Sequence, residues 1–165
     1  MIWAAVAILG FVTIQRLLEM RLAESHSRKL RAEGAVEHGR EHYVFIVALH
    51  AAWLAALWWW APGRPISVPL LIVFAVLQVG RAWVIRSLGP RWTTRIIVKP
   101  GAPLVRRGPY RFVNHPNYLI VTAEIAVLPL VFGLWQIAAV FSALNAIVLT
   151  VRIRAENQAL ASLRG

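Results

Sequence analysis

Five apolar runs separated by more polar segments dominate the pattern of this chain. Each of the first three is about as long as a helix that crosses roughly 30 Å of hydrocarbon. The last two are parted only by Gly133, so we predict a tight helical hairpin whose first arm is kinked or ended by Pro129. The pattern predicts an all-α integral membrane protein, a single domain over residues 1–165, with transmembrane helices at residues 2–18, 43–61, 68–85, 119–132 and 134–151.

The charges between these runs predict an orientation. Lys and Arg gather after the first run, after the third run and in the tail, whereas the link between the second and third runs holds only Arg64. Positively charged loops stay in the cytoplasm, so we expect the N-terminus outside and the C-terminus inside. Tryptophans mark both membrane interfaces in this arrangement: Trp3, Trp58, Trp59, Trp60 and Trp135 at outer ends, and Trp83 and Trp92 at inner ends.

Composition supports a membrane protein and narrows its partners. The chain is 59% hydrophobic and carries a formal net charge of +11. Because the cations lie beside apolar runs, membrane lipids explain them better than nucleic acid does, and we expect no nucleic-acid partner. There is no Cys, which excludes thiolate catalysis and Cys-ligated metal. The first run lacks the basic flank and cleavage site of a secretory signal, so we interpret it as a retained helix.

A polar, turn-rich block at residues 107–118 precedes the fourth apolar run. It contains His115, two Asn and two Tyr. One interpretation is a helix start, with Asn114 or His115 as the cap, Pro116 in the first turn and Tyr118 as an interface anchor. The other is a site of chemistry, because a mostly apolar chain has few other places for polar groups to gather.

Polar residues on the last run share one helix face. Asn145, Leu149, Arg152 and Glu156 are spaced by four, three and four. Arg152 at the membrane boundary suits an anionic substrate group, and Glu156 can accept a hydrogen bond from a hydroxyl or an ammonium group. The alternative is an exposed ion pair between these two side chains.

Other charged residues admit two readings each. Glu124 lies inside the fourth run, where it either pairs with Arg81 or Asn145 or lines a tunnel. Residues 38–42 match the H-x-x-E-H zinc pattern, but Gly39 weakens the required helix and no third ligand stands out, so we expect no metal. The glutamates between residues 19 and 41 predict a solvated helical extension of the first run. Neither a Rossmann nor a P-loop glycine motif is present.

The motifs Gly108-Pro109-Tyr110-Arg111 and His115-Pro116-Asn117-Tyr118, followed by Arg152 and Glu156, resemble those of the isoprenylcysteine carboxyl methyltransferase family. The resemblance covers residues 88–160. Segments 14–17 and 41–50 look like a bacterial branch that methylates oxygen on lipid-tailed polyketides such as alkylpyrones. Asn114 and Asn157 depart from the pattern, which usually has Arg and Glu at these places, and each removes a charge from the pocket.

The resemblance implies an S-adenosylmethionine-dependent O-methyltransferase in a bacterial inner membrane, with a cytoplasmic cofactor pocket. Its acceptor would be a lipophilic small molecule or a prenylated compound. Arg152 and Glu156 are the implied catalytic residues, and Arg152, Asn145 and Glu124 are the candidates for binding the acceptor. The residues implied to bind the cofactor are Leu104, Val105, Tyr110, His115, Pro116, Asn117, Tyr118 and Glu156.

The chemistry fits a site without metal. Methyl transfer from a sulfonium is an in-line displacement that needs alignment, and an acidic enol or carboxylate is already anionic near neutral pH. A weakly acidic phenol would need a base, for which Glu156 or His115 is the candidate. Two rival classes stay open: a sterol-reductase-like oxidoreductase that uses NADPH, and a non-enzymatic membrane scaffold.

Overall fold

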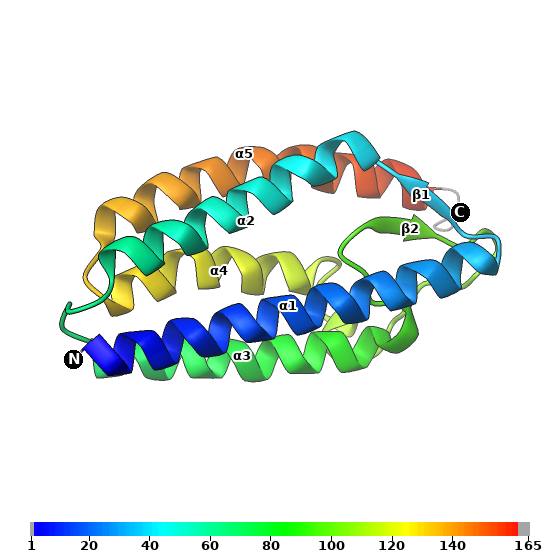
Figure 1. Ribbon diagram of the computed structural model, residues 1–165. Helices are drawn as coiled ribbons and strands as arrows, with labels where there is room; N and C mark the ends of the chain where they lie inside the picture. The colour runs from blue at the N-terminus through cyan, green and yellow to red at the C-terminus, as the bar shows by residue number, and fades with distance from the viewer. Residues whose placement is uncertain (1, 162–165) are drawn as a thin grey trace.

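The computed structural model describes residues 2–161 and consists mainly of long helices (Figure 1). Two short 3-10 turns, Gly89–Arg91 and Gly108–Arg111, and two strands complete it. The helices are α1 (Ile2–Ala32), α2 (Arg40–Trp60), α3 (Val68–Leu88), α4 (Pro116–Val131) and α5 (Trp135–Leu160), and the strands are β1 (Val36–His38) and β2 (Ile96–Val98).

The helices run lengthwise in one bundle with its polar segments at one end. α4 packs against both α3 and α5, and α5 also packs against α2. The N-terminal end of α1 and the α4–α5 connection lie at one end of the bundle, while β1, β2 and the C-terminal end of α5 lie at the other (Figure 1). We call the second end the polar end.

Four helices, α1, α2, α3 and α5, are long and apolar enough to cross a membrane. Helix α4 has 16 residues and rises about 24 Å, less than the roughly 30 Å of hydrocarbon. The predicted helical membrane architecture is therefore confirmed, whereas a fifth complete crossing stays a prediction. Large apolar side chains such as Ile72, Val76 and Val79 are 60–71% exposed on the outside of α3, as a lipid-facing surface requires.

Two helices extend beyond the predicted membrane runs, as the sequence led us to expect. Helix α1 continues to Ala32, which confirms a helical extension of the first run as far as this residue, because residues 19–32 are rich in Leu, Ala, Arg, Glu and Lys, which favour helix. Helix α5 likewise continues to Leu160. The sequence did not predict the antiparallel pairing of β1 with β2, in which Glu37 lies opposite Ile97.

The predicted α4–α5 hairpin is present. Helix α4 contains Pro129 and ends two residues later, at Val131. The amides of Gly133 and Leu134 then donate hydrogen bonds to the carbonyls of Leu130 and Pro129, each at 3.0 Å. Gly133 has φ +68°, a left-handed conformation that glycine adopts without strain, and α5 starts at Trp135.

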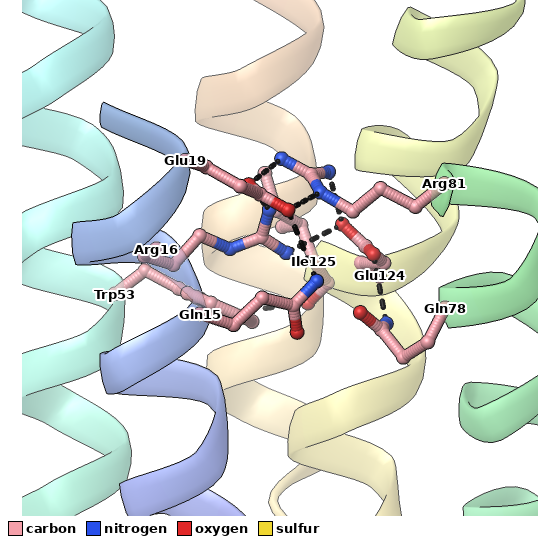
Figure 2. A network of polar contacts seen from close by, with 8 residues as sticks. All are labelled: Gln15, Arg16, Glu19, Trp53, Gln78, Arg81, Glu124 and Ile125. Carbon is pink, nitrogen blue, oxygen red and sulfur yellow. Dashed lines mark hydrogen bonds and ion pairs between the residues drawn. The ribbon is translucent and has the colours of Figure 1, made fainter. Parts of the chain in front are cut away.

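A cluster of buried charges crosses the bundle and joins α1, α3 and α4 (Figure 2). Arg81 donates to both oxygens of Glu19, at 2.7 and 2.6 Å, and to Glu124 at 2.9 Å. Arg16 completes it with contacts to Glu19 at 2.9 Å and to Glu124 at 2.7 Å. Gln78 also donates to Glu124, at 2.8 Å. We call Arg16, Glu19, Arg81 and Glu124 the buried ion cluster.

The buried ion cluster tests two predictions from the sequence, one for Glu124 and one for Glu19. Glu124 pairs with Arg81, as one of the two proposed partners, whereas Asn145 donates to Thr122 at 3.2 Å. The expectation of a solvated extension was wrong for Glu19, which is 8% exposed, because its carboxylate faces Arg81 across the bundle.

Candidate active site

Two cavities meet near the polar end of the bundle. The first has a volume of about 790 Å³ and is formed by the loops around β2, the 107–118 block and the last turns of α5. The second has a volume of about 340 Å³ and lies between α1, α2 and α5, with α4 at its side. Five residues line both cavities: Trp92, Thr93, Asn117, Tyr118 and Arg152. We call the place where they gather the junction.

The first cavity collects nearly all residues that the sequence assigned to a cofactor. Only Pro116 lines neither cavity, because it is buried in the first turn of α4. The members that line the first cavity are Leu104, Val105, Tyr110, His115, Asn117, Tyr118 and Glu156. Asn114, one of the departures from the family pattern, lines it as well. The block therefore forms a wall of a cavity as well as the start of a helix.

The Tyr118 hydroxyl links the two polar residues of α5. It donates a short hydrogen bond to Glu156 and accepts one from Nε of Arg152 at 2.9 Å. Nη2 of Arg152 donates to the backbone carbonyl of Thr94 at 2.6 Å. No direct ion pair joins Arg152 to Glu156 among the described residues. The sequence left open an exposed ion pair between Arg152 and Glu156. The structure instead has a network through Tyr118 and Thr94, which fixes the guanidinium at the junction.

His115 lies between two side chains of α5. Its Nδ1 is 3.6 Å from Glu156, and its Nε2 is 3.3 Å from the side-chain oxygen of Asn157. The imidazole also stacks on Tyr118, with ring centroids 5.3 Å apart. Asn157, the second departure from the family pattern, thus supports the ring of His115 through a hydrogen bond where a carboxylate would add charge.

The second cavity has mostly apolar walls, among them Leu49, Trp53 and Leu54 of α2. Asn145, Leu149 and Arg152 line it from α5, which places the polar face predicted on the last run toward this cavity. Glu124 lines neither cavity, because it belongs to the buried ion cluster and is only 1% exposed. The proposed contact of Glu124 with an acceptor is therefore not supported by its position.

The side chains that line the first cavity carry more positive than negative charge. Cations are frequent in its lining, and Glu156 is its one acidic residue among the described part of the chain. Arg95 is paired with Glu37 at 2.7 Å, and its guanidinium lies 4.2 Å from the centre of the Tyr43 ring. Burial, assisted by the negative charge of Glu156, raises the pKa of Tyr110, so its phenol remains a hydrogen-bond donor at neutral pH.

The sequence reading missed several residues at the junction. Trp92 was assigned to the membrane interface, but it is 2% exposed and faces the cavities, so that assignment was wrong. Thr94 was not singled out, and Tyr43 entered only as part of the segment 41–50, although their hydroxyls lie 2.9 Å apart beside Arg152. The local sequence does not place these residues at the junction, since their roles depend on contacts between distant segments.

The zinc pattern at residues 38–42 is divided between two elements. His38 ends β1, whereas Glu41 and His42 belong to α2, and Gly39 between them has φ +61°. The described residues contain no group of three or more side chains that could hold a metal ion.

Fold and site together define a helical membrane protein in which a polar cavity at one end of the bundle shares lining residues with an apolar cavity between helices. Residues 70–162 match the model of the isoprenylcysteine carboxyl methyltransferase (ICMT) family, and the chain belongs to this family. The family resemblance drawn from the motifs is thereby confirmed, and membership implies a methyltransferase integral to a membrane.

Two similar proteins extend over nearly the whole chain. An uncharacterized protein of Bacillus subtilis, YpbQ, is 36% identical over 97% of this chain and 96% of its own length. An uncharacterized protein of Haemophilus influenzae is 25% identical over 90% of each chain. No solved structure gave a significant match.

Proposed function

We propose that this protein transfers a methyl group from S-adenosylmethionine to an oxygen atom of a lipid-tailed acceptor. The observation that carries the proposal is the junction, where a polar cavity and an apolar cavity share Arg152 and Tyr118 as lining residues. A water-soluble cofactor suits the first cavity and an alkyl tail suits the second, so the two reactants would meet beside Arg152.

The residues of the first cavity suit the cofactor chemically. Glu156 and the side-chain oxygen of Asn117 are acceptors for an ammonium group or ribose hydroxyls, and the Asn117 oxygen is buried without a partner among the described residues. Tyr110 and His115 add a donor and a flat ring, while Leu104 and Val105 offer apolar contact to a base. Bound there, S-adenosylmethionine would supply an electrophilic methyl group.

Arg152 would hold the acceptor oxygen in line with that methyl group. Its Nε and Nη2 are fixed by Tyr118 and Thr94, so the planar guanidinium has a defined orientation before any ligand arrives. Such preorganisation favours a displacement reaction, which depends mainly on alignment. An ionised enol or carboxylate needs no base, whereas a phenol would deliver its proton to Glu156 or His115.

The acceptor would reach the second cavity from the bilayer. Leu17 of α1 and Val47 of α2 line this cavity and are also 54% and 37% exposed, so the tail would enter between these two helices. Along α2 the lining extends from Tyr43 to Leu54, about 16 Å at 1.5 Å per residue. Each buried methylene contributes about 0.8 kcal/mol, so kcat/KM should rise about fourfold per methylene until the tail fills this length. A series of acceptors that differ only in tail length measures this dependence.

The cations of the first cavity favour one alternative, an oxidoreductase that binds the phosphates of NADPH. Arg106 and Arg111 line this cavity in addition to the acid-paired Arg95 and Lys99. A titration that compares the two cofactors therefore separates the two enzyme classes.

The test is isothermal titration of the full chain in nanodiscs with S-adenosylhomocysteine and, separately, with NADPH. We expect binding of S-adenosylhomocysteine that weakens at least tenfold in both His115→Ala and Glu156→Ala, since each removes a polar contact of the first cavity. Arg154→Ala is the matched control, because Arg154 lies on α5, is exposed and lines neither cavity. Binding of NADPH alone, or unchanged affinity in both variants, would contradict the proposal.

We also propose that the polar end of the bundle lies in the cytoplasm, with the N-terminus outside. The cation-rich segments between α1 and α2 and between α3 and α4 both lie at that end, in agreement with the retention of positive loops. Reporter fusions to the C-terminus should be active in the cytoplasm; a C-terminal reporter active only outside would refute this orientation.

A further inference from the structure

The outward face of α3 ends in an aromatic and then a cationic residue. Ile72, Val76 and Val79 recur along this face and are 60–71% exposed. Trp83, 52% exposed, and the exposed Arg86 continue it, because all these positions lie within about 80° around a helix that turns about 100° per residue. Apolar side chains, then Trp, then a cation is the order in which a helix meets hydrocarbon, interface and headgroups.

A second segment brings apolar side chains to the same end of α3. The 3-10 turn Gly108–Arg111 packs against α3, and Gly108 lies so close to Trp83 that an added Cβ would stand 3.1 Å from the indole nitrogen. Phe112 and Val113 follow this turn directly and are 76% and 39% exposed. We call Trp83, Phe112 and Val113 the interface patch. Exposed aromatic groups at the end of a lipid-facing helix are covered by the membrane interface.

Cations without a partner border the interface patch. The side chains of Arg86 and Arg111 make no hydrogen bond or ion pair with residues 2–161, and the guanidinium of Arg111 lies 6.0 Å from the centre of the Phe112 ring. Residues 42–123 contain neither Asp nor Glu, so no acid of the surrounding sequence is at hand to neutralise them. By contrast, Arg95 and Lys99 of the same loop are paired with acids.

We propose that the interface patch and Arg86 form a binding site for an anionic phospholipid in the leaflet at the polar end of the bundle. The acyl chains lie along the outward face of α3, and the glycerol region meets Trp83 and Phe112. Arg86 holds the phosphate, with Arg111 on its other side. Arg86 and the residues of the interface patch line neither cavity, so neither proposed reactant of the methyl transfer occupies this site.

Charge and shape favour a lipid over two other occupants. A soluble anion would pair with the arginines but would leave Trp83 and Phe112 uncovered. A second copy of this chain, docked by the same patch, would bring identical cations face to face, which is unfavourable. A phospholipid supplies both the apolar cover and the negative charge.

Native mass spectrometry of the full chain in detergent micelles tests the site, because it reports bound lipids and oligomeric state together. The probes are phosphatidylglycerol and phosphatidylcholine with the same acyl chains. The variants are Arg86→Gln, Arg86→Lys and Phe112→Ser. Arg154→Gln is the matched control, since Arg154 is an exposed cation near the C-terminal end of α5 and lines neither cavity.

We expect the wild-type protein to prefer phosphatidylglycerol. Arg86→Gln should weaken its binding about fivefold, which corresponds to about 1 kcal/mol for one cation at an anionic lipid surface, while phosphatidylcholine binding stays nearly unchanged. Arg86→Lys keeps the charge and should bind as the wild type does, which also shows that the Gln variant does not fail through misfolding. Phe112→Ser should weaken both lipids alike, because it removes apolar cover and no charge.

Four results would overturn the proposal. They are equal wild-type affinity for the two lipids, the same loss in Arg86→Gln as in Arg154→Gln, displacement of phosphatidylglycerol by inorganic phosphate at constant ionic strength, and a dimer that Phe112→Ser dissociates. The third would indicate a site for a soluble anion, and the fourth a contact between copies of the chain. Neither cofactor nor acceptor takes part in the measurement, so its outcome is independent of the proposed methyltransferase function.

Discussion

The buried ion cluster predicts that Arg81 is among the most stabilising side chains of the protein. Arg81 makes three hydrogen bonds to two carboxylates, and its side chain is 8% exposed (Figure 2). Arg81→Met leaves Glu19 and Glu124 with Arg16 as their remaining cation, so the cluster changes from neutral to one uncompensated negative charge. Removing one partner of a buried pair costs about 3–5 kcal/mol, a 150- to 5,000-fold change in the unfolding equilibrium.

A matched surface pair separates this effect from the loss of any cation. Lys99 and Glu33 are 2.6 Å apart, as close as the tightest contact of Arg81, but their side chains are 41% and 56% exposed. Lys99→Met should therefore cost far less. Equilibrium unfolding by sodium dodecyl sulfate in mixed micelles, followed by tryptophan fluorescence, measures both free energies.

The charge argument also predicts a rescue. In Arg81→Met/Glu124→Gln the cluster is neutral again, so this double variant should be more stable than Arg81→Met alone. Glu124 lines neither cavity, whereas Glu19 lines the second, so neutralising Glu124 should restore more stability than Glu19→Gln. The reasoning is refuted if Arg81→Met costs no more than Lys99→Met, or if neither double variant recovers.

Three further predictions concern the site and its support. Arg152→Lys keeps the charge but loses the planar fork, so turnover should fall roughly 30- to 1,000-fold, about 2–4 kcal/mol of transition-state stabilisation, with little change in S-adenosylhomocysteine affinity; wild-type turnover would contradict this. Gly108→Ala should lower the melting temperature sharply, because Gly108 has φ +58° and an added Cβ would lie 2.1 Å from Oγ of Ser87; an unchanged melting curve would disprove it. Burial alone would raise the pKa of Glu37, but the hydrogen bond and charge of Arg95 outweigh it and hold the pKa below its ordinary value of 4.5. Stability from this pair should therefore be complete above about pH 4.5 and decline as the pH falls through the lowered pKa, and Glu37→Gln should flatten that part of the stability curve.

The helices could be predicted from the sequence because their signal is local. Apolar runs long enough for a bilayer appear directly in the chain, and Gly133 with Pro129 marks the hairpin. The cavity wall at residues 107–118 was also visible, since polar groups are rare in so apolar a chain. The face shared by Arg152 and Glu156 followed from the helical repeat alone.

What the sequence could not predict depends on contacts between distant segments. Glu19 is one of several similar glutamates, and only the approach of Arg81 separates it from the exposed ones. The pairing of β1 with β2 joins residue 36 to residue 98, and such short strands have no clear pattern of their own. Trp92 could be recognised as a junction residue only once the two cavities were known.

The buried ion cluster also implies an order of assembly during membrane insertion. Helix α1 brings Arg16 and Glu19 already paired, three residues apart, so it can enter the bilayer with its charges neutralised. Helix α3 then brings Arg81 alone and α4 brings Glu124 alone, and a single charge at the centre of a membrane helix costs about 2.5–3.5 kcal/mol. Each of these later helices is therefore stabilised by docking against the helices that precede it. A chain interrupted after α3 would leave Arg81 beside Glu19, which already pairs with Arg16. Addition of α4 would then supply the carboxylate of Glu124 and make the buried ion cluster neutral.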